Sequence, residues 1–135
     1  MSILTLRTEN LEAATRYYVD GLGWRPVLAV PGEVTFLQVA PGLALSLFDA
    51  PKFDEDAGRP LPYPFTLAHN VGTDAEVDRV VERMVAAGGS VVMEAQHAEW
   101  GGYHAFTSDP VGFCWEIAHN PGWRVAADGT VSLGG

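Results

Sequence analysis

The fold is decided by a segment that occurs twice: Gly42-Leu43-Ala44-Leu45-Ser46-Leu47 aligns with Gly112-Phe113-Cys114-Trp115-Glu116-Ile117, 70 residues later. In both copies a glycine is followed by a run of residues with the character of a β-strand. Two further glycines, Gly23 and Gly89, each follow a predicted helix at an offset of 66 residues. A repeat of this length indicates that one supersecondary unit is used twice.

The periodicity of apolar residues predicts a strand, a helix and three strands in each half of the chain. In the first half the strands are residues 3–7, 24–30, 34–39 and 43–48, and the helix begins after the Asn10 cap and carries Leu11, Ala14, Tyr18 and Leu22. In the second half the strands are residues 65–71, 90–93, 103–107 and 113–118, and the helix, capped by Thr73 or Asp74, carries Val77, Val80, Val81, Met84 and Val85. We therefore expect one domain with two βαβββ modules, residues 1–48 and 65–120, a polar connector, residues 49–64, and a tail, residues 121–135, that contains a small hairpin. The alternative, a ferredoxin-like α+β sandwich, lacks the third strand after each helix.

The composition is that of a globular protein. The 135 residues are 47% apolar and 19% charged, and 8 basic and 17 acidic residues give a formal charge of −9. Lys52 is the only lysine, which argues against a nucleic-acid partner. We expect no membrane span and no secretory signal, because no run approaches ~18 apolar residues and the start lacks a basic region. Cys114 is the only cysteine, so no internal disulfide forms, and a cytoplasmic protein is expected.

Three stretches of the chain resemble the vicinal-oxygen-chelate superfamily, which contains glyoxalase I, bleomycin-resistance proteins and extradiol dioxygenases. They are residues 11–24, residues 65–71 with the helix that follows, and residues 100–116, and the likeness covers residues 3–121. The most specific part is Asp109-Pro110-Val111-Gly112 followed by Glu116. The resemblance implies an α+β fold in which the two modules form a curved eight-stranded mixed sheet. Helices would cover its convex side, a ligand cavity would occupy its concave side, and the protein would often be a homodimer.

Glu116 is the first candidate for a functional residue. Strand alternation places Phe113, Trp115 and Ile117 on the face beneath the helices and Cys114, Glu116 and Ala118 on the other face. By the repeat, Ala44, Ser46 and Phe48 share that other face in the first module. A carboxylate in the middle of a strand needs water or a partner, so Glu116 either lines a cavity or is an ordinary solvated residue. By the resemblance, it corresponds to the last metal-binding carboxylate of the family.

The remaining metal positions of the family carry no metal ligand in this sequence. By the resemblance they correspond to Ile3, Ser46 and Thr66. Divalent transition metals take three or more protein ligands, so Glu116 alone is too few. We therefore expect no metal and no other cofactor, and neither glyoxalase I chemistry nor extradiol ring cleavage. A metal site stays an alternative if a strand register is shifted by one residue.

None of the four histidines has the spacing of a metal motif. His69 is expected in the core, His104 and His119 near strand ends, and His97 in a polar loop over residues 94–102. The sequence contains neither a phosphate-binding glycine loop nor a Gly-x-Ser-x-Gly elbow, and Cys114 has no adjacent base. Nucleophilic catalysis is therefore unsupported.

Aromatic and polar residues indicate a pocket for a small molecule. Trp100 and Tyr103 flank two glycines, and Phe48 lies on the expected cavity face. These aromatic residues either close the end of the sheet as packing or form the walls of a pocket. The polar and small groups that would complete such a pocket are Arg7, Ser46, Thr66, Asn70, Cys114 and Glu116.

Two functions from different classes are compatible with these residues. The first is a metal-independent homodimer that binds a planar or cationic organic ligand, with antibiotic sequestration of the bleomycin-resistance type as the model. The charge of −9 fits a basic ligand, although solubility is the simpler explanation. The second is a glyoxalase-like lyase or isomerase in which Glu116 is the general base. A metal-dependent dioxygenase or lyase with ligands at other positions is a third alternative.

Overall fold

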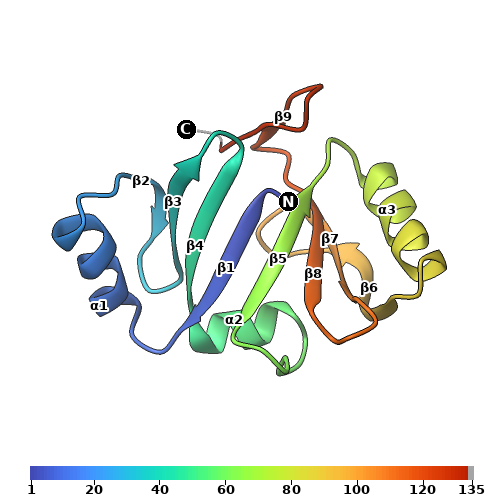
Figure 1. The fold of residues 1–135 in the computed structure, drawn as a ribbon, viewed down its shortest axis with the longest axis horizontal. Helices are drawn as coiled ribbons and strands as arrows, with labels where there is room; N and C mark the ends of the chain where they lie inside the picture. The colour runs from blue at the N-terminus through green and yellow to red at the C-terminus, as the bar shows by residue number, and fades with distance from the viewer. Residues whose placement is uncertain (134–135) are drawn as a thin grey trace.

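The computed structural model describes residues 1–133, which form an open eight-stranded sheet with helices (Figure 1). The first half contains β1 (Ile3–Thr8), α1 (Leu11–Thr15), a π-helical turn η1 (Arg16–Gly21), β2 (Pro26–Val30), β3 (Val34–Ala40) and β4 (Leu43–Asp49). The second half contains β5 (Phe65–Asn70), α3 (Asp74–Ala86), β6 (Ser90–His97), β7 (Tyr103–Ser108) and β8 (Cys114–His119). Helix α2 (Ala50–Asp56) joins the halves, and β9 (Arg124–Val125) pairs with β10 (Val131–Ser132) in the tail.

The strand order shows how the repeat builds the sheet. The strands lie in the order β2-β3-β4-β1-β5-β8-β7-β6, so each half contributes four adjacent strands. Within each half the first strand is parallel to the last, β1 to β4 and β5 to β8, and the halves meet where β1 and β5 pair antiparallel. The predicted mixed sheet of two βαβββ units is confirmed, and the ferredoxin-like alternative is excluded.

The two glycines that open the repeated segment have the same backbone role. Gly42 and Gly112 have φ values of 71° and 96°, a left-handed region that glycine enters without a steric penalty. Each turns the chain into the strand that follows, β4 or β8. The strand registers then place Ser46 beside Thr5 of β1 and Glu116 beside Ala68 of β5. The offset of 70 residues therefore relates equivalent positions of the two modules.

Helix α3 forms as its sequence predicts. The Thr73 side chain accepts a hydrogen bond from the N–H of Glu76 at 3.2 Å, and the Glu76 carboxylate accepts one from the N–H of Gly72 at 2.8 Å. Val77 and Val81 are buried against Ile117 of β8 and against β7. Because Ile117 packs beneath α3, its neighbour Glu116 points to the other face of β8.

The first helix is shorter than predicted. After α1 the chain widens into η1, where the N–H of Leu22 donates to the carbonyl of Tyr17, five residues back. The extra residue in this turn rotates the apolar stripe. Tyr18 and Val19 pack against the leucines of β3 and β4, while Leu22 is 49% exposed. The expectation that Leu22 continues the buried stripe is wrong for this reason.

The predicted polar connector is also wrong in part, because residues 50–56 form helix α2. Asp49 precedes the helix and Pro51 lies in its first turn, where a missing N–H costs nothing. Phe53 is 4% exposed and packs with side chains of the concave face, so α2 lies on the side of the sheet opposite α1 and α3. The expectation of helices only on the convex side therefore holds for α1 and α3 and not for α2.

The C-terminal tail covers another part of the concave face. The predicted hairpin is present, and Val125 pairs with Val131. Trp123 packs edge-on against Phe36, with ring centroids 5.5 Å apart, over a buried cluster of Ile3, Ala44 and Ala68. In Figure 1, α2 and the tail lie at opposite ends of the central strands. They bound the space in which the candidate site lies.

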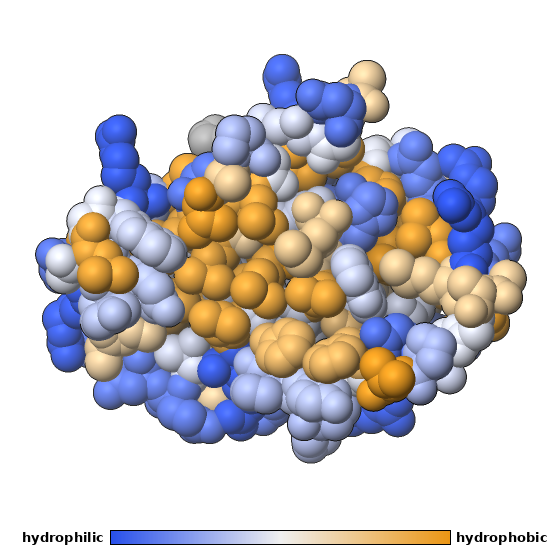
Figure 2. All heavy atoms as spheres, in the orientation of Figure 1, coloured by the Kyte–Doolittle hydropathy of each residue, from blue (hydrophilic) through white to orange (hydrophobic). Residues whose placement is uncertain are grey.

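Hydrophobic side chains also gather on the outer surface. Figure 2 shows them over the middle of the sheet, between α1 and α3. Leu4 and Leu6 of β1 and Leu67 of β5 are partly exposed, and Leu4 is directly opposite Leu67. An apolar area of this kind is typical of a contact surface between proteins.

Candidate functional site

A cavity of about 280 Å³ lies on the concave side of the sheet. Its walls contain four aromatic side chains, Phe36, Phe48, Trp100 and Trp123. Three carboxylates, Glu33, Asp56 and Glu116, also line it. Within the part of the chain that the structure describes, no lysine or arginine lines this cavity. The site thus combines flat apolar surfaces with negative charge.

Glu116 is held by a buried histidine. His104, on the neighbouring strand β7, has a side chain only 4% exposed, and its Nδ1 lies 2.8 Å from Glu116 Oε2. Burial alone would lower the pKa of His104, but the hydrogen bond to Glu116 and the charges of Glu116 and Asp56 outweigh it and raise this pKa. The imidazole of His104 is therefore protonated more readily than that of a free histidine. The neighbouring strands β7 and β8 place both side chains on the concave face.

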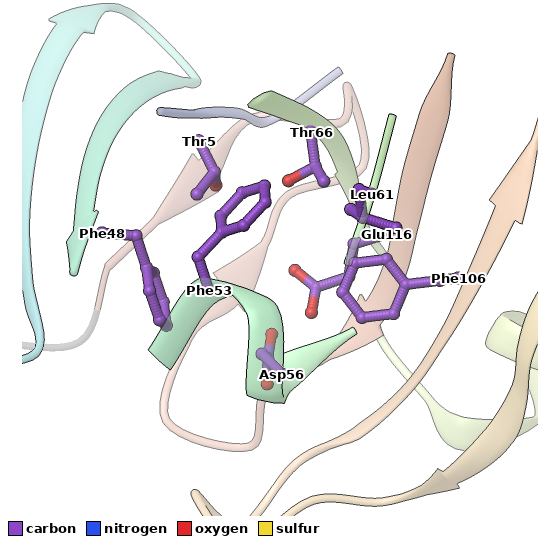
Figure 3. Close-up of a pocket in the computed structure, with 8 residues that line it drawn as sticks. All are labelled: Thr5, Phe48, Phe53, Asp56, Leu61, Thr66, Phe106 and Glu116. Atoms are coloured by element: carbon purple, nitrogen blue, oxygen red, sulfur yellow. The ribbon is translucent and has the colours of Figure 1, made fainter. Parts of the chain in front are cut away.

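Helix α2 adds a second carboxylate to this pair. Donor atoms of Asp56, His104 and Glu116 all lie within 4.8 Å of one another. Burial, and next the charge of Glu116, raise the pKa of Asp56 to about 7. The Trp100 ring, with its centroid 5.2 Å from that of His104, stands edge-on beside the group. Figure 3 shows Asp56 and Glu116 on the same side of the recess.

The metal positions of the family do not fit a metal in this chain. Ile3 pairs with Ala44 and Ala68 in an apolar cluster that Trp123 covers, and the residue of β1 that lies beside both Ser46 and Thr66 is Thr5, another hydroxyl. Ser46 and Thr66 are 1% and 4% exposed, and the Phe53 ring from α2 points toward Thr66 (Figure 3). The recess that Phe53 leaves beside Thr66 and Glu116 has a volume of only about 20 Å³. The side chains at these positions carry only hydroxyl or hydrocarbon groups, and the Phe53 ring fills the space beside Thr66. They do not fit a transition-metal ion, and we derive no metal chemistry there.

Five of the predicted site residues lie around the cavity. Phe48, Asn70, Trp100 and Glu116 line it directly, and Thr66 lines the recess beside Glu116. Asn70 is 4% exposed, and its Oδ1 receives no hydrogen bond from residues 1–133. Trp100 is 44% exposed at the mouth. The roles of these residues in binding remain predictions.

Two predicted site residues point elsewhere. Arg7 makes two hydrogen bonds of 2.9 Å to the carboxylate of Asp54 and a further one to Glu9. The Tyr103 hydroxyl donates to Asp78 Oδ1 at 2.8 Å, on helix α3, so this ring belongs to the convex side. The prediction of pocket roles for Arg7 and Tyr103 is corrected accordingly.

Ser46 and Cys114 share the concave face but do not reach the cavity. Ser46 is buried between β1 and β3, and its Oγ has no partner among the described residues. Cys114 is covered by Ala57 and Phe106, and burial, followed by the charge of Glu116, raises the pKa of its thiol to about 11. Both residues lie on the concave face, as predicted. Neighbouring side chains and strands cover them, so they do not line the cavity.

Sequence reasoning missed His104, Asp56 and Trp123 as parts of the site. The alternation of β7 puts His104 on the same face as Phe106, which is a signal the sequence does carry. Asp56 cannot be placed from the sequence alone, because the prolines of residues 49–64 predict a connector and not a helix. Trp123 lies outside the repeat, and its place over the cavity depends on how the tail folds back.

The fold and the site together define an α+β protein with an aromatic, acidic cavity on the concave face of a two-module sheet. Comparison with known proteins is consistent with this. Residues 2–117 match the family model of the Glyoxalase/Bleomycin resistance protein/Dioxygenase superfamily, and the chain belongs to this superfamily. No curated protein matches the chain significantly.

Solved structures agree with the assignment. A glyoxalase-related enzyme from Fulvimarina pelagi is 38% identical, with 100% of this chain and 98% of that chain covered and a TM-score of 0.53. A superfamily member from Vibrio splendidus is 18% identical, with 87% and 97% covered and a TM-score of 0.61. A protein from Legionella pneumophila described as an NAD-dependent benzaldehyde dehydrogenase is 16% identical, with 87% and 96% covered and a TM-score of 0.72. The last two likenesses show the fold alone.

None of the helices among residues 1–133 is long and apolar enough to cross a membrane.

Proposed function

We propose that the cavity binds a planar or cationic organic molecule, and that this binding needs no metal at Ile3, Ser46 or Thr66. The single observation that carries the proposal is the lining of the cavity. Aromatic rings offer surfaces on which a planar molecule stacks, and they attract cations through their faces. Glu33 and Glu116, together with Asp56 when it is ionised, give the cavity a negative potential, and no lysine or arginine of the lining offsets it.

The size of the cavity suits a small ligand. About 280 Å³ is at the lower end of the volumes found for pockets of small organic molecules. Phe36 lies in the first half of the chain, Trp100 in the second half and Trp123 in the tail, so a ligand that contacts all three rings would join these segments. Asn70 Oδ1 offers an unengaged acceptor in the same wall.

The experiment is a fluorescence titration of chelator-treated protein with probes that separate the effect of planarity from the effect of charge. We use the planar cation proflavine, the planar anion anthraquinone-2-sulfonate and the non-planar cation tetraethylammonium. Proflavine is expected to bind at least tenfold more tightly than the anion and to lose affinity in Glu33→Gln, which removes one lining charge. Tighter binding of the anion would contradict the role given to the acidic lining, and no binding of any probe would contradict the proposal as a whole.

A second candidate function is a lyase or isomerase with Glu116 as general base. It is favoured by one observation, the 2.8 Å contact with His104, which would orient the carboxylate as catalysis requires. Glu116→Gln would abolish turnover if Glu116 is the base, but would change ligand affinity only modestly if it is a wall residue.

The homodimer and a cytoplasmic location also stay predictions.

A further inference from the structure

One group of side chains beside the cavity differs from an ordinary ligand wall, because Asp56 and Glu116 of the lining lie close to His104. Asp56, His104 and Glu116 come from α2, β7 and β8, three elements that are separate in the sequence. The structure assigns to them a binding site for a divalent transition-metal ion, of which only Glu116 corresponds to a metal position of the family. This inference goes beyond the proposed function, because it requires no organic ligand.

The geometry is that of a site for one ion. Zinc and similar ions bind nitrogen and oxygen ligands at roughly 2.0–2.2 Å, so two donor atoms on one ion lie about 3–4 Å apart. In this chain the donor atoms lie within 4.8 Å, and His104 Nδ1 is 2.8 Å from Glu116 Oε2. Binding would replace the hydrogen bond between His104 and Glu116, and the three donor atoms would have to lie closer together than the 4.8 Å within which they now lie.

Burial and charge make a cation favourable at this place. The side chains of His104 and Glu116 are 4% and 18% exposed, and Asp56 is partly buried. Two carboxylates face a single imidazole, and among residues 1–133 no lysine or arginine forms an ion pair with either of them. Desolvated carboxylates are unfavourable unless a cation compensates them, and a divalent ion would do so.

The fold explains why the site lies here. Helix α2 brings two residues to the concave face: Phe53 fills the space beside Thr66, and Asp56 reaches Glu116 one turn further along (Figure 3). The same helix thus closes the family's positions and supplies a ligand to a neighbouring place. Strands β1, β4 and β5 supply no metal ligand at the family's positions and lie on one side of β8. His104 lies on β7, which is on the other side of β8.

The ligand types select the ion. One imidazole nitrogen with two carboxylates suits Mn²⁺, Co²⁺, Ni²⁺ or Zn²⁺, whereas Mg²⁺ and Ca²⁺ prefer oxygen ligands alone. The test adds each ion to chelator-treated protein and follows thermal unfolding and stoichiometry by calorimetry. Zn²⁺ or Co²⁺ is expected to bind one per chain and to raise the unfolding temperature by about 5–10 °C at a hundredfold excess over Kd. Mg²⁺ and Ca²⁺ at the same concentrations are expected to give no shift.

Variants locate the ion. Asp56→Asn and His104→Gln are each expected to weaken Zn²⁺ binding at least tenfold. Glu33→Gln is the matched control for charge, because it removes a carboxylate from the same cavity outside the three ligands. His97→Gln is the control for exposed histidines, since His97 is exposed and lines the same neighbouring pocket as His104. Both controls are expected to bind Zn²⁺ as the unmodified chain does.

The inference is overturned if Zn²⁺ and Co²⁺ give no stoichiometric binding to the folded, unmodified chain, or if Glu33→Gln weakens binding as much as Asp56→Asn does. Equal shifts with Mg²⁺ would show general attraction to acidic groups and also overturn it. These outcomes are independent of the proposed function, which is measured with proflavine in the presence of a chelator. If both bind, metal and proflavine are expected to compete, because both are attracted by Asp56 and Glu116.

Discussion

At the scale of single residues, the site depends on contacts that leave little room for change. The Trp100 ring lies directly against Gly102, so a Cβ built at Gly102 would lie 1.8 Å from Trp100 Cζ3 and 2.7 Å from the carbonyl oxygen of His119. Glycine is required here by close approach rather than by backbone conformation. This contact sets the position of Trp100 beside His104.

The first prediction concerns Gly102→Ala. The added methyl group must displace the Trp100 ring, so we expect destabilisation of about 1–3 kcal/mol and weaker proflavine binding. Chemical unfolding and fluorescence titration measure the two effects. The same substitution in a Trp100→Ala background should cost less, because only the contact with the His119 carbonyl remains. Equal costs in both backgrounds would show that Trp100 does not lie against Gly102.

The second prediction concerns the pH dependence of stability. Burial, and next the positive charge of the chain's N-terminal amino group, lower the pKa of His69 in the folded state. A lowered folded pKa means that the unfolded chain binds more protons, so this stability is present above pH ~6.5 and is lost as the pH falls through the folded pKa. Between pH 7.5 and 5, the free energy of unfolding should decrease less in His69→Gln than in the unmodified chain. Chemical unfolding at both pH values measures this, and equal decreases would contradict it.

At the scale of elements, helix α2 determines the composition of the concave face beside Glu116. Its seven residues lie between the two modules. They place the Phe53 ring in the space beside Thr66 and the Asp56 carboxylate beside Glu116. The helix is short and would be marginal alone, so burial of Phe53 against the sheet is what stabilises it. Removing that contact should therefore affect the helix and the site together.

The third prediction is that Phe53→Ala destabilises the protein by about 2–4 kcal/mol, because a nearly fully buried aromatic side chain is lost. We expect the recess beside Thr66 to enlarge and Zn²⁺ binding to weaken as α2 loosens. Urea unfolding and calorimetry give the two values. Lys52→Ala, on the exposed side of the same helix, is the control and should change stability by less than about 0.5 kcal/mol. A similar loss in both variants would contradict the role of Phe53.

At the scale of the whole molecule, one face of the sheet contains the candidate site and the other has exposed apolar side chains. The concave face is bounded by α2 and the tail and holds the acidic cavity. The convex face carries α1 and α3, with apolar side chains between them (Figure 2). Burying this area against a second copy would remove apolar surface from water, which is the main driving force of association.

The fourth prediction is that the chain is a homodimer. Light scattering at micromolar concentration should give a mass twice the 14.5 kDa of one chain. Added salt should not dissociate the dimer, because the expected contact around Leu4, Leu6 and Leu67 is apolar and is not screened. A mass of one chain across a dilution series would show that the protein is a monomer.

The sequence by itself determined the two modules, the strands, helix α3 and the face on which Glu116 lies. These features follow from local rules: alternation along a strand, apolar spacing along a helix, and glycines such as Gly42 and Gly112 at turns. Only the tertiary structure decided the composition of the site. His104 and Asp56 meet Glu116, Arg7 turns to Asp54, and Tyr103 turns to Asp78, because contacts between distant segments depend on packing. No local pattern in the sequence records that packing.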